Sequence, residues 1–310
     1  MLKAGDSVTG FSVLAGKEII RSAPVATELE VKLTLSESAQ SRAFEWLKGQ
    51  PGASEGPVKT LVNRYYDTPN AALNQARAAL RVRQAGDRYI QTLKTQGEFV
   101  NGAHRRQEWE WDLPGPDLDL ELLEQTLLRS EVDLGELELA FETNFQRRII
   151  MLEQAESVIE VALDSGEVVG GKQARPLYEV EFELKAGEPA ALLENARALA
   201  QAVPVFLNLV SKAEQGYYLA GIYRPSLALP ASGFSSLSFL HYLSLAWLTG
   251  DTVCLPASTL AEIERQAEAV GLLPQWRLVA KALETGIAVE NLIEQFPEFG
   301  QLQLALAAAG

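Results

Sequence analysis

The segment TELEVKL, residues 27–33, alternates charged or polar and apolar side chains with a period of two. Alternate residues of a β-strand point to the same face of the sheet. Glu28, Glu30 and Lys32 therefore share one face, and the apolar residues between them share the other. A half-buried strand with its charged face in solvent shows the same pattern, so this segment predicts a strand without placing its charges.

Five other segments repeat the alternation, with ionisable or polar residues on one face and mainly apolar residues on the other. The charged faces hold Arg81 and Arg83; Thr92 and Lys94; Arg106, Glu108 and Glu110; Glu160 and Asp164; and Glu179, Glu181 and Glu183. With two further strand-like runs, eight strands are predicted. Their residues are 27–33, 58–68, 78–86, 87–96, 105–113, 137–152, 156–166 and 175–187.

If the eight strands close on themselves, one face of every strand lies inside. Charges outside would leave an interior of Leu, Val and Trp, whereas charges inside would line a lumen with carboxylates and cations. A row such as Glu179, Glu181 and Glu183 is costly unless a cation binds between its members. We therefore favour charges inside, where divalent cations neutralise the carboxylates and a polyanionic ligand neutralises the Arg and Lys side chains.

The composition restricts the ligand classes. The 310 residues include 27 basic and 41 acidic side chains, for a formal net charge of −14. Proteins that bind nucleic-acid phosphates are normally basic, so no nucleic-acid partner is expected. Cys254 is the only cysteine, and His104 and His241 are the only histidines. A bound metal must then be held mostly by carboxylates, which favours Mg²⁺ or Mn²⁺.

Three regions are predicted along the chain. Residues 1–24 form an N-terminal extension without the apolar run of a signal peptide, and 25–223 hold the strands. Residues 224–310 show only helical periodicity and predict a small all-α region. The most apolar stretch, 236–248, is too short to span a bilayer, so no membrane partner is expected. A cytoplasmic location fits the single cysteine.

Two features are set aside. Residues 166–172 spell G-x₄-G-K, the first part of a phosphate-binding P-loop. Gln173 follows where Ser or Thr should hold Mg²⁺, and the segment joins two strands, so this motif is rejected. His241 stands among Leu240, Tyr242 and Leu243 and is expected to pack within a helix.

Glu28-x-Glu30-x-Lys32 resembles the ExExK signature of the CYTH superfamily, the triphosphate tunnel metalloenzymes. Companion motifs follow in the family's order over about residues 26–220: YYDTP (65–69), LRVR (80–83), QTLK (91–94), HRRQEWE (104–110), ALDSGE (162–167), YEVEFELK (178–185) and SKAEQGY (211–217). The resemblance implies an α+β fold, in which covering helices surround an eight-stranded antiparallel closed barrel. It is greatest for the bacterial inorganic triphosphatase branch, which implies hydrolysis of inorganic triphosphate or other triphosphates.

The resemblance also implies roles for individual residues. The metal ligands, for Mg²⁺ or Mn²⁺, are Glu28, Glu30, Glu181 and Glu183. The phosphate cradle is Lys32, Arg81, Arg83, Lys94, Arg106, Arg147 and Lys212. The catalytic groups are Lys32 and Lys212 with Glu160, Asp164 and Glu179, of which the carboxylates position the attacking water or a second metal.

The chain departs from the family pattern in two places. Gln215 stands where many relatives carry Arg, and the region 224–310 does not form a complete CHAD domain, the helical domain that often follows in this branch. Two other functions remain open: a class IV type adenylyl cyclase, and a non-catalytic module that binds polyphosphate.

Overall fold

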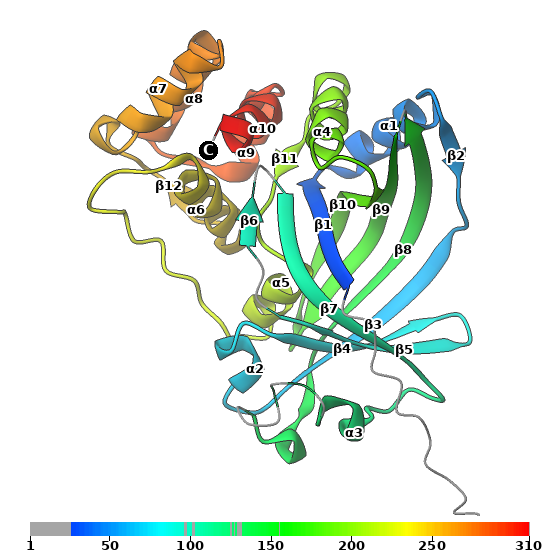
Figure 1. The fold of residues 1–310 in the computed structure, drawn as a ribbon. Helices are drawn as coiled ribbons and strands as arrows, with labels where there is room; N and C mark the ends of the chain where they lie inside the picture. Colours follow the sequence, from blue (N-terminus) through cyan, green and yellow to red (C-terminus); the bar gives the residue numbers. More distant parts are fainter. Residues whose placement is uncertain are drawn as a thin grey trace, which may run out of the picture.

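The computed structural model describes residues 26–95, 98–100, 103–124, 126, 128, 132–154 and 156–309. The predicted N-terminal extension, 1–24, lies outside these ranges. Within them, the main sheet has eleven strands that pair antiparallel (Figure 1). They are β1 (Ala26–Thr34), β2 (Ala53–Glu55), β3 (Lys59–Asp67), β4 (Ala79–Ala85), β5 (Arg88–Lys94), β6 (Glu98–Val100), β7 (Ala103–Leu113), β8 (Glu138–Gln154), β9 (Ser157–Gly170), β10 (Gln173–Ala186) and β11 (Phe206–Leu207).

The prediction of an α+β protein with a large antiparallel sheet and covering helices is confirmed, but the uniform eight-stranded closed barrel is wrong. All eight predicted strands are present, and the short strands β2, β6 and β11 extend the sheet. Strands of two or three residues are too short to show an alternating pattern in the sequence. In addition, β1 divides its length between two neighbours: Glu30–Thr34 pair with β10, and Ala26–Glu30 pair with β7. β1 therefore joins β7 to β10, but it pairs with each of them over only five residues and at different ends of its length.

The apolar faces of the strands point outward, toward helices. α1 (Glu37–Lys48) begins at Ser36, whose side chain accepts a hydrogen bond from the Ala39 backbone N–H. Together with α4 (Ala190–Ala202), it packs on a buried apolar cluster of the sheet. The strand members of this cluster include Val31, Leu33, Val161, Leu163, Val180 and Phe182. Because these residues occupy the outer face, the alternating charged residues point inward, as the sequence favours.

The C-terminal region forms a second apolar core around Phe239, Trp276 and Phe299. Its helices are α6 (Ser236–Thr249), α7 (Ala261–Ala269), α8 (Leu273–Thr285), α9 (Val289–Gln295) and α10 (Phe299–Ala309). The region is not entirely helical, because β12 (Thr252–Val253) and β13 (Ile287–Ala288) form a separate pair. The fully buried Gln303 of α10 bonds to both the N–H and the C=O of Leu207 in β11, which ties this region to the sheet.

The remaining helices are short: α2 (Ala72–Gln75), α3 (Leu120–Leu123) and α5 (Lys212–Leu219). Among the described residues between β7 and β8, α3 is a single short α-helix. Trp109 and Trp111 pack with Leu123 of α3 in a separate apolar cluster on the outer face. The rejected P-loop segment forms the hairpin between β9 and β10. No helix in the described ranges has the length and hydropathy needed to cross a bilayer.

The docking of α5 on β8 leaves no room for a side chain at Gly216. A Cβ there would lie 1.9 Å from Cδ2 of Phe141, which is stacked on Tyr65 with ring centroids 4.5 Å apart. We expect Gly216→Ala to lower the free energy of unfolding by about 1–3 kcal/mol, as overpacking does, and to move Lys212 at the start of the same helix. Urea unfolding measures the loss. Gly115→Ala is the control, because a Cβ at Gly115 meets nothing within 4 Å. Equal stability of the two variants would contradict this packing.

Candidate active site

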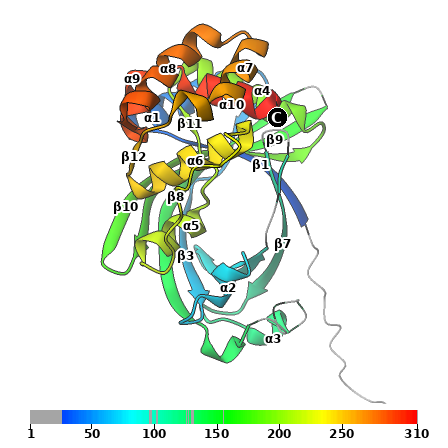
Figure 2. The ribbon, with the colours of Figure 1, turned by 90° about the vertical axis from the view of Figure 1, so that its left-hand side faces the viewer.

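A cavity of about 1710 Å³ lies on the charged side of the sheet. Figure 2 shows strands on both sides of it, β1 and β7 on one and β3, β8 and β10 on the other. Its lining includes most of the residues predicted for the site: Glu28, Glu30, Lys32, Arg81, Arg83, Lys94, Arg147, Glu160, Glu181, Glu183 and Lys212. The described side chains thus confirm that these residues share one compartment, although their roles are not tested by this grouping.

One wall of the cavity is acidic. Strand register places Glu30 of β1 opposite Glu183 of β10, and Glu183 opposite Glu160 of β9. The three carboxylates therefore form a row across three neighbouring strands, and Glu28 lies two residues from Glu30 on the same face. Burial, together with the negative charges of Glu28 and Glu160, raises the pKa of Glu183, although the adjacent Lys185 opposes this. The row therefore concentrates negative charge on this wall of the cavity.

The predicted metal ligands do not converge on one point. Glu28 pairs with Lys94 at 2.7 Å, Glu183 pairs with Lys185 at 2.6 Å, and Glu181 pairs with Arg147 and Lys212. Among the described residues, no group of three carboxylate, cysteine or histidine side chains is arranged to hold a metal. The donor chemistry nevertheless fits a hard divalent cation, because the row is made only of carboxylates, whose oxygens such cations prefer.

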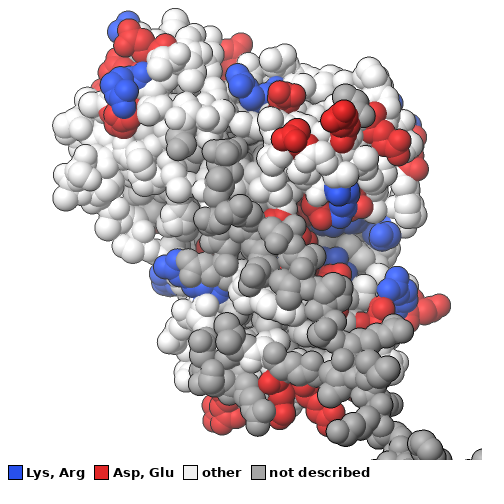
Figure 3. All heavy atoms as spheres, in the orientation of Figure 1, with Lys and Arg blue, Asp and Glu red and all other residues white. Residues whose placement is uncertain are grey.

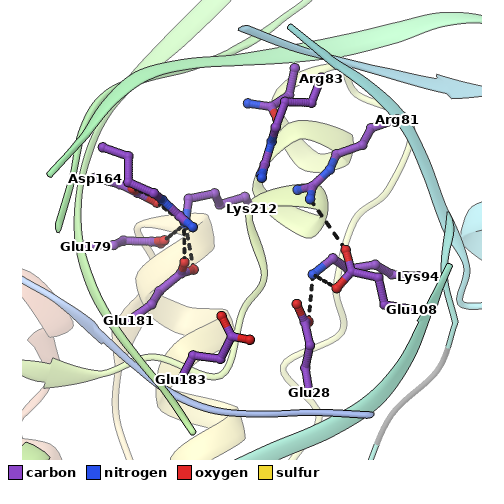
Figure 4. Close-up of polar contacts among 12 residues, drawn as sticks. Glu28, Arg81, Arg83, Lys94, Glu108, Asp164, Glu179, Glu181, Glu183 and Lys212 are labelled. Carbon is purple, nitrogen blue, oxygen red and sulfur yellow. Dashed lines mark hydrogen bonds and ion pairs between the residues drawn. The ribbon is translucent and has the colours of Figure 1, made fainter. Parts of the chain in front are cut away.

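The facing wall holds a pair of guanidinium groups. Arg81 and Arg83 extend from β4 into the cavity (Figure 4). Burial and the positive charges of Arg81 and Arg147 lower the pKa of Arg83 to about 9, so Arg83 is charged at neutral pH but poorly compensated. Nε of Arg83 donates to Oδ1 of the fully buried Asn63 at 2.7 Å, which fixes its direction. Nε of Arg81 is buried and has no hydrogen-bond partner among the described residues. Together these groups form a site for an anion.

A network of five charged groups lies beside this pair, between β8, β9, β10 and α5. Arg147 makes a bidentate pair with Asp164, at 2.7 Å for each bond, and also bonds Glu181 at 2.7 Å. Lys212 contacts all three carboxylates, Asp164 at 2.9 Å, Glu179 at 2.6 Å and Glu181 at 2.7 Å. Desolvation opposes the charges of these groups, but the two cations nevertheless hold the pKa of Glu181 well below its usual range. Asp164 and Glu179 are fully buried, so their negative charges are balanced by the cations of this network and not by solvent.

Two further predicted residues have backbone or carboxylate partners. Lys32 donates from Nζ to the Val210 carbonyl, and Lys94 bridges Glu28 and Glu108 at 2.7 and 2.9 Å. Arg106 is the one cradle residue whose side chain lies outside the described part of the chain; its backbone pairs with that of Glu28.

Two contributing residues were given no role from the sequence. The alternation already placed Glu108 on a charged face, and in the structure Glu108 is buried between Lys94 and Arg81. Gln215, at the departure from the family pattern, donates to Glu179 at 3.0 Å in a fully buried position. The expectation for His241 was wrong: it is exposed and lines the cavity from α6. The apolar neighbours of His241 point to other faces of the helix, which a linear reading does not separate.

The strand-rich part of the chain is similar to known proteins. The family model described as "CYTH domain" matches residues 26–217. The inorganic triphosphatase of Haemophilus influenzae is 34% identical over 197 residues, which are 62% of this chain and 54% of that protein. The chain thus spans about half the length of the curated relative it matches.

Two solved structures are more distant. A Hippeastrum protein named for adenylyl cyclase and described as having a dominant triphosphatase activity is 22% identical, with a TM-score of 0.46 over 64% of this chain and 98% of its own. The capping-enzyme triphosphatase of Mimivirus is 13% identical, with a TM-score of 0.37 over 56% of this chain and 89% of its own. At these scores neither likeness carries an inference about this chain.

The charge network predicts an unusual effect of pH on stability. In the wild type, the pKa of Glu181 is lower in the folded state than in the unfolded state. The ionised carboxylate therefore stabilises the fold at pH values above its unfolded pKa, and this stabilisation is lost as the pH falls toward the folded pKa. In Lys212→Met, Asp164 and Glu181 keep Arg147 but Glu179 loses its cation, so the buried negative charge is no longer balanced. The pKa of Glu181 then rises, and its contribution to stability at neutral pH shrinks. We expect a loss of about 3–5 kcal/mol at neutral pH, as for a broken buried pair, and a smaller loss at pH 5.

Urea unfolding at pH 5 and pH 7.5 measures this difference. Lys185→Met is the matched control, because Lys185 and Glu183 are 38% and 24% exposed. Its removal should change stability by less than about 1 kcal/mol. A Lys212→Met protein as stable as this control would show that the network has no structural role.

Proposed function

The chain belongs to the CYTH domain family, and on that premise we propose that it is a metal-dependent triphosphatase. It hydrolyses inorganic triphosphate to pyrophosphate and phosphate. One observation carries the proposal: within a protein of net charge −14, the cavity separates a carboxylate row from a group of buried cations. A substrate that bridges a divalent cation and several guanidinium groups satisfies both walls, and a chain of phosphates does this.

The eight long strands are proposed to enclose the substrate as a tunnel. In support, β1 pairs with β10 along one edge and with β7 along the other, so strands surround the cavity. A wall of strands excludes much of the water and strengthens the electrostatic interactions of the cations with the phosphates.

Arg81 and Arg83 are assigned to the phosphoryl oxygens. Their planar groups bind two oxygens at once, and the unpartnered Nε of Arg81 supplies a donor that needs an acceptor. Lys94 of β5 and Lys32 of β1 also line the cavity and add positive charge at other phosphates. Because these groups are already in position, they stabilise the charge that develops on the leaving pyrophosphate.

Glu160 is assigned to the attacking water. It faces the cavity, and among the described residues it takes part in no salt bridge, so its carboxylate can accept a proton. The water oxygen forms a bond to the terminal phosphorus while the bridging P–O bond breaks. The electron pair leaves with pyrophosphate, and the water proton passes to Glu160 and then to solvent.

The metal ligands are proposed to be Glu30 and Glu183, the latter once it leaves Lys185. Glu28 or Glu181 joins them once either leaves its own cation partner. The carboxylate chemistry supports Mg²⁺ or Mn²⁺ without separating them. When bound, the cation neutralises phosphate oxygens and so favours their approach to the acidic wall. We also propose a cytoplasmic location. The helices of residues 224–310 are proposed to cover the sheet. On the face in Figure 3 the surface of these helices is mostly uncharged away from α7 and α8.

The first test is Arg81→Gln. We expect kcat/KM for inorganic triphosphate to fall on the order of 10²–10³-fold, as when a charge-stabilising donor is removed. Phosphate release measures the effect. Arg265→Gln is the control, because Arg265 pairs with Glu262 on the exposed face of α7 and should leave the activity unchanged. Release of cyclic nucleotide from ATP would favour the cyclase function instead, and tight polyphosphate binding without phosphate release would favour the binding module.

The second test concerns the metal. Excess chelator should abolish phosphate release, and Mg²⁺ or Mn²⁺ should restore it. Glu30→Gln should raise the metal concentration for half-maximal activity at least about tenfold, since it removes one carboxylate from the acidic row. Glu290→Gln, a substitution on the short helix α9, controls for the general loss of one negative charge. Full activity in chelator would overturn the metal assignment.

A further inference from the structure

The network of Arg147 and Lys212 contains one more carboxylate than it has cations. Two of the three, Asp164 and Glu179, have side chains that are 0% and 1% exposed, and they cannot leave their partners without stranding buried charge. The third, Glu181, has a side chain that is 15% exposed and lines the cavity. The fixed pair already balances the two cations, so Glu181 is the replaceable member.

The contacts of Glu181 are those that a phosphoryl group would make. Oε2 accepts from Nη2 of Arg147 at 2.7 Å, and Oε1 accepts from Nζ of Lys212 at 2.7 Å. Two oxygens of one anion thus bind a guanidinium and an ammonium group at charge-assisted distances. Building on the proposed function, we propose that the Glu181 carboxylate occupies a phosphate subsite of the cavity and is displaced from it by the substrate.

The surroundings favour this exchange. Arg81, Arg83 and Arg147 all line the same cavity, so their guanidinium groups are available to one anion. A triphosphate carries several negative charges into that region, whereas Glu181 carries one. On the same face of β10, Glu183 lies two residues from Glu181, and Lys32 of β1 lies opposite Glu181 in the strand register. When the Glu181 carboxylate is released, the acidic row and Lys32 therefore lie close to it.

The exchange gives Glu181 two opposed effects. It competes with triphosphate for Arg147 and Lys212, which weakens binding of the substrate when no metal is present. Once released, it adds a carboxylate to the acidic row, where the proposed metal binds. Glu181 is therefore an affinity-determining residue, whose removal separates substrate binding from metal-dependent turnover.

The test measures binding of inorganic triphosphate to the full chain by calorimetry, in excess chelator, so that no turnover contributes. We expect Glu181→Gln to tighten this metal-free binding about tenfold, because a neutral amide competes much less well for two cations. The substitution preserves shape, and thermal unfolding reports whether the fold is retained. With metal present, the same variant should release phosphate more slowly than the wild type.

Glu183→Gln is the matched control. It removes the same charge from the same strand and the same cavity, but Glu183 contacts Lys185 and neither Arg147 nor Lys212. We expect it to change metal-free binding less than threefold. Equal tightening in both variants would mean that only the general field matters, and no tightening in Glu181→Gln would mean that its carboxylate does not compete; either overturns the proposal. A wild type that binds triphosphate without hydrolysing it would refute the proposed function while this binding test still decides the role of Glu181.

Discussion

Five charged groups with little access to water determine how the cavity wall is built. Arg147 and Lys212 can be buried only because Asp164, Glu179 and Glu181 surround them. Of the two fully buried carboxylates, Asp164 in turn contacts both cations and Glu179 contacts Lys212. The contacts join β8, β9, β10 and α5, so the position of α5 depends on them as much as on its packing. The capping box of Ser211 and Glu214 and the close approach of Gly216 to Phe141 complete that placement.

The same wall requires a covered outer face. A strand that carries charges on one side carries Val31, Leu33 or Phe182 on the other, and these must be removed from water. α1 and α4 supply this cover, and α10 packs against α4 and against the edge strand β11. The C-terminal helices have their own core, but they also extend the cover of the sheet. Burial outside and charge inside are therefore two results of one alternating pattern.

The inner charges are not distributed evenly, and the separation has chemical consequences. The like charges of Glu28 and Glu160 act on Glu183, while those of Arg81 and Arg147 act on Arg83 a short way around the cavity (Figure 4 shows Arg81 and Arg83 with Glu28, Glu181 and Glu183). A ligand of the opposite sign would stabilise each group. A negative net charge for the whole protein is compatible with a polyanionic substrate, because these buried groups act at short range in a poorly screened space.

The sequence by itself determined the eight long strands and which residues share a face, because alternation is a local property of extended backbone. Comparison of the strands also indicated that the charged faces point inward. Only the tertiary structure decided the partners: Lys32 meets Val210 across 178 residues, Gln215 meets Glu179 across 36, and Glu181 turns to Arg147 and Lys212 and not to the other predicted metal ligands. These contacts depend on strand register and on where α5 docks, which are set by packing between distant segments and leave no local pattern in the chain.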